Sequence, residues 1–350
     1  MMVPGISSFI TVFSLLLLSI STSDLPTFEL IPRRILPLTP SHFTALDAPE
    51  LSTVCTERCA FQESQTEAQA TTHKLDFETA YYNGSRTLTT VALRVRQNDK
   101  EHLERRTHSV RTRRQIYGPD MRFSIHNQRY LKDFPFATAV RISTGCTGVL
   151  VTERHVLTAA HCIHDGQDYV KGAKMLRVGF LRPVAKSSLR WVRVQSTRVP
   201  RGWIGAPIEA SMDYDYAVLE LRRAQPRPHM RLAVTPPLKD LAGKRMHFSG
   251  FDSDRRGELV YRSCLVEQQT EHLLYQHCDA QPGASGSGVY GRLWDKGRWE
   301  RKVIGVFSGH QWVEISGEPK DYNVAVRLTP LKYAQICYWI RGSSFNCQNE

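Results

Sequence analysis

With 350 residues, of which 41% are hydrophobic and 23% charged, the chain is long enough for two or three structural units. Its composition is typical of a globular protein and excludes a low-complexity one. Residues 1–114 contain 13 Lys and Arg against 12 Asp and Glu, whereas residues 115–350 contain 33 against 22, so the net charge of +12 lies almost wholly in the C-terminal part. That charge attracts polyanions such as heparin-like glycosaminoglycans, but it is equally typical of an ordinary cationic surface.

An apolar run, residues 9–20, lies near the N-terminus. It is too short to cross a bilayer as a helix, but it is typical of a signal peptide, and Ser21 and Ser23 follow as small residues where a signal peptidase could cut. No Lys or Arg precedes Arg33, so the usual basic start is missing, and a buried core helix is the alternative. We expect a signal peptide over residues 1–23, a protein secreted to the extracellular space, and no membrane anchor.

Residues 24–114 are rich in Thr, Ser, Glu and Gln, with one strand-like stretch at Thr87–Val95. We expect them to form a poorly ordered pro-segment, glycosylated at Asn83 in an Asn-Gly-Ser sequon. The segment ends in the basic run Arg111–Arg114, which matches the substrates of proprotein convertases, although it could be only a linker. We therefore expect a convertase to cut after Arg114, which makes residues 115–350 the functional domain.

Short β-rich runs, separated by Gly, Pro and Asp turns, recur throughout residues 115–350. They are Ala137–Ser143, Gly148–Thr152, Met175–Phe180, Trp191–Val194, Ala217–Leu221, Lys244–Phe251, Leu259–Cys264, Gly288–Leu293, Lys302–Phe307 and Tyr322–Arg327. This spacing predicts an all-β protein, and 236 residues are enough for two small barrels. Helical spacing of the apolar residues over Leu331–Ile340 predicts a C-terminal helix that ends at Gly342.

Three segments of this domain carry residues suited to acyl transfer. They are Thr158-Ala159-Ala160-His161-Cys162, Asp215-Tyr216-Ala217-Val218-Leu219 and Gly283-Ala284-Ser285-Gly286-Ser287-Gly288. A serine hydroxyl becomes a useful nucleophile when an imidazole takes its proton and a carboxylate orients that imidazole. Glycines around Ser285 allow a sharp turn, so that the amides of Gly283 and Ser285 could form an oxyanion hole.

We expect His161, Asp215 and Ser285 to be the catalytic residues. Asp213 is the alternative to Asp215, which we prefer because the apolar run of the strand starts directly after it. Ser287 also lies in the glycine-rich loop, and we interpret it as a packing or hydrogen-bonding residue.

In the order His, Asp, Ser, these segments resemble the motifs of chymotrypsin-like serine proteases, and the serine loop is most similar to that of the V8-like glutamyl endopeptidases. A narrower resemblance, to the vertebrate serine protease 23 group, rests on Cys278–Tyr290, Val303–Trp312 and Leu331–Trp339. The resemblance implies two six-stranded antiparallel β-barrels with a C-terminal helix. It also implies a secreted serine endopeptidase that acts on proteins or peptides and needs no cofactor. The alternative is a weakly active or non-catalytic, basic protein of the same fold that binds extracellular matrix or heparin. Neither interpretation involves nucleic acid.

Eight cysteines, an even number, favour disulfides in a secreted chain. Only Cys55 and Cys59 have close spacing, and no second pair completes a four-ligand zinc set, so we expect no metal site. The resemblance implies a bridge between Cys146 and Cys162. The simplest remaining pairs are Cys264 with Cys278, Cys337 with Cys347, and Cys55 with Cys59, although spacing alone does not establish them.

The sequence departs from the chymotrypsin-like pattern at the residue before the nucleophile. Zymogens of the family carry an aspartate there, to which the new N-terminal amine binds after cleavage, whereas this chain has Ala284 and would begin at Gln115. An ion pair cannot form without the carboxylate. We therefore expect the loop Gly283–Gly288 to be ordered by its own backbone hydrogen bonds and glycine turns.

Substrate preference has two possible origins. Asp279 lies six residues before Ser285, where trypsin-like enzymes have the acidic floor of the specificity pocket, but the family cysteine between the two positions is missing. Phe307, Gly309 and His310, on or next to the expected substrate-pairing strand, are the other candidates, and His310 would favour an acidic side chain. The sequence leaves both alternatives open.

Overall fold

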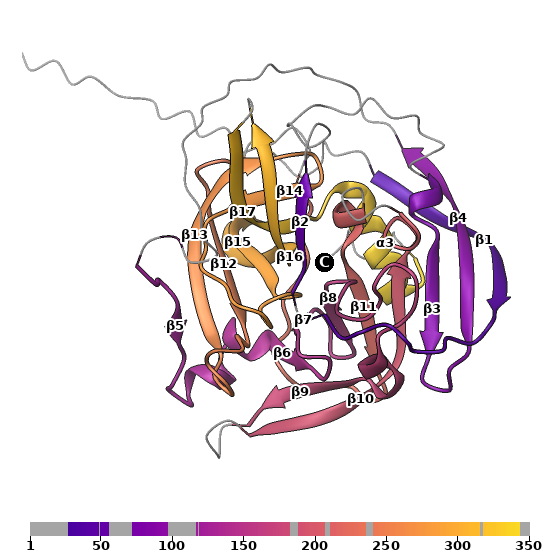
Figure 1. Ribbon diagram of the computed structural model, residues 1–350, viewed down its shortest axis with the longest axis horizontal. Coiled ribbons are helices and arrows are strands. Elements are labelled where there is room, and N and C mark those ends of the chain that lie inside the picture. Colours follow the sequence, from indigo (N-terminus) through magenta and orange to yellow (C-terminus); the bar gives the residue numbers. More distant parts are fainter. Residues whose placement is uncertain are drawn as a thin grey trace, which may run out of the picture.

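The computed structural model describes residues 27–48, 50–55, 72–96, 117, 119–182, 188–206, 211–235, 241–315 and 318–343. The expected signal peptide, Arg114, Cys59 and Cys347 lie outside these residues. Strands dominate the described part, and none of its helices is long and apolar enough to cross a membrane. Figure 1 shows two β-barrels beside each other, with N-terminal strands along the outer side of the first.

The first barrel is a closed sheet of six antiparallel strands. Its members are β6 (Ala139–Ile142), β7 (Thr147–Leu150), β8 (His155–Thr158), β9 (Arg177–Leu181), β10 (Leu189–Pro200) and β11 (Ala217–Leu221). Closure arises because β10 pairs with both β9 and β11. Short apolar runs such as β7, in which all four residues are buried, form these strands because they fill the barrel interior.

The second barrel has the same closed, six-stranded form. Its members are β12 (Arg245–Gly250), β13 (Val260–Gln269), β14 (Leu273–Gln276), β15 (Gly288–Asp295), β16 (Arg298–Ile315) and β17 (Glu318–Arg327). Here β13 closes the sheet by pairing with both β12 and β14, and the short β5 (Phe123–Ser124) adds to β13. The two barrels touch closely, since a Cβ at Gly288 would lie 2.4 Å from a methyl group of Val149.

Helix α3 (Pro330–Arg341) follows the second barrel and packs against the first (Figure 1). Thr329 caps its N-terminus by accepting the Lys332 amide, and Gly342, with a φ of 70°, ends it in the left-handed conformation. The expected helix and its glycine stop are therefore confirmed. Trp339, which is buried, stacks edge-on against Phe77 of the N-terminal segment.

The N-terminal segment extends the sheet of the first barrel. Strands β1 (Thr27–Leu38), β3 (Phe77–Tyr81) and β4 (Arg86–Arg96) form an antiparallel unit, and β3 pairs with β10. Strand β4 includes the stretch expected at Thr87–Val95. A further strand, β2 (Ser52–Cys55), pairs in parallel with β16 of the second barrel. The described residues of this segment thus hold more regular structure than its polar composition indicated.

The fold predicted from the sequence, two six-stranded antiparallel barrels and a C-terminal helix, is confirmed. Every β-rich run expected in residues 115–350 overlaps a strand. Three described strands of this range are additional: β5, β8, which precedes His161, and β14. Four short 3-10 helices complete the described elements: η2 (Tyr130–Lys132), η3 (Phe136–Thr138), η4 (Lys171–Met175) and η5 (Met212–Tyr214).

Candidate active site

His161 and Asp215 lie at one end of the first barrel because their strands are paired there. His161 follows β8, Asp215 precedes β11, and the register places Thr158 opposite Ala217. One oxygen of Asp215 accepts the backbone amide of His161 at 2.8 Å, and the other lies 2.8 Å from the imidazole Nδ1. This two-point contact fixes both the position of the imidazole and its orientation. Asp213, the alternative, makes no such contact with His161 within the described residues.

The carboxylate of Asp215 is fully buried, yet it remains the charged member of the site. Burial works to raise the pKa of Asp215, but the charge of His161 and hydrogen bonds from His161 and Ser308 outweigh it and hold the pKa below its usual value. A charged carboxylate at Nδ1 keeps the proton on that nitrogen, which leaves Nε2 as the acceptor. The imidazole is therefore prepared to act as a general base.

Ser285 lies in a tight loop that the second barrel presents to the same end of the first. Gly283 and Gly286 have φ of 99° and 83°, a region that favours glycine. A Cβ at Gly286 would lie 2.2 Å from both the Thr158 side-chain oxygen and the Thr147 carbonyl, so only glycine allows this approach to the histidine strand.

Backbone hydrogen bonds hold this loop, both within it and to residues outside it. The amide of Ala284 donates to Gln281, that of Gly286 to Phe307, and that of Ser287 to Ala284. The hydroxyl of Ser287 also donates to the Ala284 carbonyl, at 2.6 Å, in keeping with a hydrogen-bonding role. Ala284 itself is fully buried in the apolar core of the second barrel, and its methyl group offers no carboxylate to an ammonium group.

Thr147 of β7 fastens the loop to the first barrel, a role that the sequence did not reveal. Its amide donates to the Ser285 carbonyl, and its hydroxyl donates to the Gly283 carbonyl at 2.7 Å. The same hydroxyl accepts the Phe251 amide. Within the described residues, the amides of Gly283 and Ser285 donate to no protein acceptor. They are therefore available to an oxyanion, in agreement with the expected pair of donors.

Among the described residues, the hydroxyl of Ser285 is hydrogen-bonded to a backbone carbonyl and not to the imidazole of His161. It donates to the backbone carbonyl of Ser308 at 2.9 Å, and a hydroxyl has only one hydrogen to donate. The side chain of Ser308, in turn, donates to Asp215. Ser285 and His161 each expose only 2% of their surface. Both side chains are thus closed off from solvent, and the Ser285 hydroxyl must give up the Ser308 carbonyl before it can donate to another acceptor.

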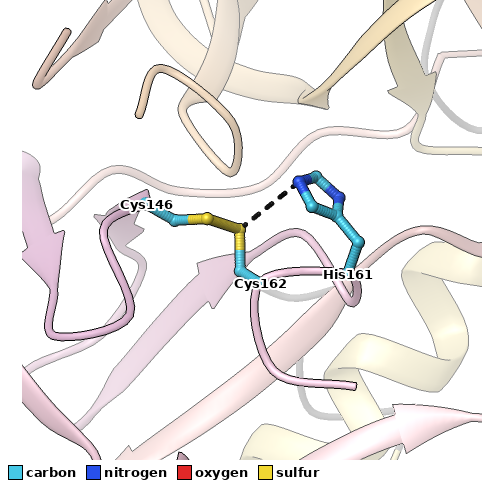
Figure 2. A group of neighbouring side chains, drawn as sticks. All are labelled: Cys146, His161 and Cys162. Atoms are coloured by element: carbon cyan, nitrogen blue, oxygen red, sulfur yellow. Dashed lines mark hydrogen bonds between the residues drawn. A yellow bond between two sulfur atoms is a disulfide. The ribbon is translucent and has the colours of Figure 1, made fainter. Parts of the chain in front are cut away.

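A disulfide lies directly beside the imidazole of His161. Figure 2 shows the Cys146–Cys162 bridge with His161, whose Nε2 lies 3.7 Å from the sulfur of Cys162. These three residues are close enough to resemble a metal cluster, but both sulfurs are bonded to each other, so thiolate ligands are not available. The bridge instead ties the strand hairpin of the first barrel to the histidine turn.

Two of the four expected disulfides are present among the described residues. They are Cys146–Cys162 and Cys264–Cys278, with S–S distances of 2.09 and 2.10 Å. Cys337 is disulfide-bonded, but its expected partner Cys347 lies outside the described residues. The proposed partner of Cys55 also lies outside them.

The residues considered for a specificity pocket are dispersed and already have partners. Asp279 is buried and accepts the backbone amides of Tyr117 and Met121, both at 2.7 Å. His310 pairs with Asp321. The ring of Phe307 stacks on Phe248 within the second barrel.

Gly309 has the backbone of Leu51 against it, and a Cβ there would lie 2.1 Å from the Leu51 carbonyl oxygen. The four candidates therefore do not surround one open pocket in this structure. The role of Asp279 in holding Tyr117 and Met121 had no signal in the sequence, because these residues lie 162 and 158 positions earlier in the chain.

The sequence profile of the trypsin family matches residues 125–334. The chain is 50% identical over 341 residues to serine protease 23 of Rattus norvegicus, covering 91% of this chain and 89% of that protein. It is 42% identical over 375 residues to inactive serine protease 35 of Homo sapiens, covering 91% of each. A solved structure of a Glu endopeptidase in complex with MPD is 21% identical and covers 64% of this chain and 98% of its own, with a TM-score of 0.48.

Proposed function

The chain belongs to the trypsin family of serine proteases, and we propose that it is a secreted serine endopeptidase that hydrolyses peptide bonds through an acyl-enzyme on Ser285. One observation carries the proposal. Asp215 holds His161 at two points, and the glycine-rich loop brings Ser285 to the same end of the first barrel. A serine, an imidazole and a buried carboxylate in this arrangement are the groups that acyl transfer requires.

The reaction begins when the Ser285 hydroxyl turns from the Ser308 carbonyl to Nε2 of His161. The imidazole takes the proton as the oxygen attacks the substrate carbonyl, and Asp215 stabilises the resulting imidazolium. The amides of Gly283 and Ser285 donate to the oxyanion of the tetrahedral intermediate. His161 then gives its proton to the leaving amine, and water hydrolyses the acyl-enzyme by the same steps in reverse order.

The N-terminal processing belongs to the same proposal. Residues 1–23 are a signal peptide, residues 24–114 a pro-segment, and a convertase cuts after Arg114 to leave Gln115 at the new N-terminus. Asn83, the proposed glycosylation site, is exposed in the turn between β3 and β4, as attachment of a glycan requires. Sequencing the secreted protein from its N-terminus tests the cleavage, and a chain that still begins near Asp24 would contradict it.

The nucleophile is tested by comparing Ser285→Ala with Ser287→Ala in a peptide-library cleavage assay. We expect Ser285→Ala to be secreted normally and to lose about a millionfold in turnover, as expected for removal of a serine nucleophile. Ser287→Ala is the matched control because it lies in the same loop and loses only a hydrogen bond to Ala284. Equal activity of the two variants, under conditions in which the parent protein cleaves peptides, would contradict the assignment.

A second candidate function, a non-catalytic basic protein that binds heparin-like polyanions, is favoured by one feature of the surface. The exposed hairpin of β15 and β16 carries Arg292 over the ring of Trp299, and Trp294 and Trp299 are more than half exposed. A relative named inactive serine protease 35 also matches the chain. Salt-sensitive retention on heparin without any peptidase activity in the processed protein would favour this function over the first.

A further inference from the structure

Residues 41–47 of the N-terminal segment are fastened to a loop of the first barrel. Both oxygens of Asp168 accept hydrogen bonds, one from the Ser41 hydroxyl at 2.6 Å and the other from the amide and hydroxyl of Thr44. The amide of Lys171 donates to Ala45, and that of Gly172 donates to Asp47. These contacts fix residues 41–47 to the first barrel just before the chain crosses to the second barrel.

The chain then pairs with the second barrel beside the candidate active site. Strand β2 runs parallel to β16, with Ser52 opposite His310 and Val54 opposite Trp312. The amide of His310 donates to the Leu51 carbonyl at 2.8 Å, and Figure 1 shows β2 on the side of β16 that faces the first barrel. The side chain of Leu51 is buried in the core, whereas Val54 is 61% exposed.

The direction of β2 is opposite to that of a productive substrate. Ser285 lies at the Ser308 end of this edge, because its hydroxyl donates to the Ser308 carbonyl. A peptide that pairs with β16 and ends with its acyl carbon at Ser285 must run from residue 313 toward residue 308, antiparallel to β16. Strand β2 runs the other way, so it uses the backbone groups of this edge without presenting a peptide bond to the nucleophile.

Further contacts hold the N-terminal segment in place independently of β2. Strand β3 adds to β10 over five residue pairs. The side-chain amide of Gln335 on α3 donates to the Leu75 carbonyl. Leu75 and Phe77 are buried in the same apolar core as Trp339. Strand pairing combined with shared apolar core residues is typical of a stable interface rather than of a removable cover.

We propose that residues 51–54 are a built-in inhibitory strand, and that residues 27–96 stay bound to the two barrels as a separate polypeptide after the chain is cut. The strand occupies the edge of β16 that a substrate peptide would use, which leaves Ser285 and His161 buried. Cleavage after Arg114 alone then does not open the site. Displacement of β2 is the second, separate step. The inhibitory part of this inference rests on the proposed endopeptidase function.

Two covalent probes separate peptide access from nucleophile reactivity. A small fluorophosphonate reports whether Ser285 reacts at all, and a peptidyl diphenyl phosphonate also needs the edge of β16. Leu51→Asp places a charge in the buried position that holds the strand, and Val54→Asp is the matched control on the exposed side. We expect the peptidyl probe to label Leu51→Asp at least about tenfold faster than wild type, and Val54→Asp at the wild-type rate.

Equal labelling of wild type and Leu51→Asp by the peptidyl probe would overturn the inhibitory strand while leaving the endopeptidase intact. If neither probe labels wild type, Leu51→Asp or Val54→Asp, the endopeptidase function is refuted. Amide hydrogen exchange then tests separately whether β2 pairs with β16. The amide of His310 should be protected in wild type and Val54→Asp and should exchange faster in Leu51→Asp. Equal exchange in all three would refute β2 pairing in solution.

Retention is measured on the full chain after it has been cut in its basic run. The N-terminal fragment should elute with residues 115–350 in gel filtration at physiological salt and separate only under denaturing conditions. A fragment that elutes by itself would overturn retention, whatever the activity of the protein.

Discussion

Replacing Asp215 by Asn tests the electrostatic arrangement of the site. Asp215 accepts three hydrogen bonds, from the amide of His161, from Nδ1 of the same residue and from the Ser308 hydroxyl. An asparagine amide has only one oxygen, so its NH2 group must face at least one of these donors. The imidazole is then driven to the tautomer with its proton on Nε2, which cannot accept the proton of Ser285.

The expected loss is about ten-thousandfold in the rate of fluorophosphonate labelling, by analogy with the same change in a Ser-His-Asp triad. At about 1.4 kcal/mol per factor of ten this equals roughly 5 kcal/mol of activation free energy. The assay is the second-order labelling rate at pH 7, measured in the wild-type and Leu51→Asp backgrounds so that the inhibitory strand does not hide the effect.

Asp213→Asn is the control for this prediction. Asp213 lies two residues earlier, burial raises its pKa, and it makes no contact with His161 among the described residues. We expect its labelling rate to stay within a few-fold of the parent protein. The reasoning is refuted if Asp215→Asn, with an unchanged melting temperature, labels within tenfold of its parent, or if both variants lose the same rate.

Four other outcomes follow from the contacts. Ser308→Ala removes one of the three hydrogen bonds on the triad carboxylate and should slow labelling by at least about tenfold, since a hydrogen bond to a charged group contributes about 1.5–3 kcal/mol. Hydrogen bonds from Ser41 and Thr44 outweigh the effect of burial and hold the pKa of Asp168 below its usual value, so this docking is stable above about pH 4 and weakens as the pH falls further. The weakening would show as faster exchange of the amides near Asp168 in acid in the wild-type protein but not in Asp168→Asn. Unchanged exchange in the wild-type protein would count against it. Converting Gln115 to pyroglutamate should leave labelling unchanged, because residue 284 offers no carboxylate to the amine; lost labelling would reveal another partner. Retention on heparin should fall steeply with added salt, since charges are screened beyond about 8 Å at physiological ionic strength, and flow-through at low salt would refute it.

Local sequence was sufficient to predict most of the barrels and the three residues of the candidate triad. Strand β11 is an example. Its apolar run starts directly after Asp215, and the strand has the expected bounds, Ala217–Leu221. The glycines around Ser285 indicated a sharp turn, and the structure places positive φ angles at Gly283 and Gly286. In these segments the local pattern and the tertiary contacts favour the same structure.

Features that depend on partners distant in the chain were not predictable in this way. Strand β2 is only four residues long and forms by adding to β16, about 260 residues later. The engagement of Asp279 by the amides of Tyr117 and Met121 has the same origin. The rotamer of Ser285 also depends on a carbonyl 23 positions away. No periodicity within a short window of sequence contains this information.

The central claim is that Ser285 is an activated nucleophile, and mass spectrometry of the fluorophosphonate-treated protein tests it most directly. The account predicts one covalent adduct per chain, mapped to the peptide that contains Ser285, formed fastest in Leu51→Asp and absent from Ser285→Ala. Complete absence of an adduct on Ser285 in the folded, cut Leu51→Asp protein, or an adduct that persists in Ser285→Ala, would contradict it.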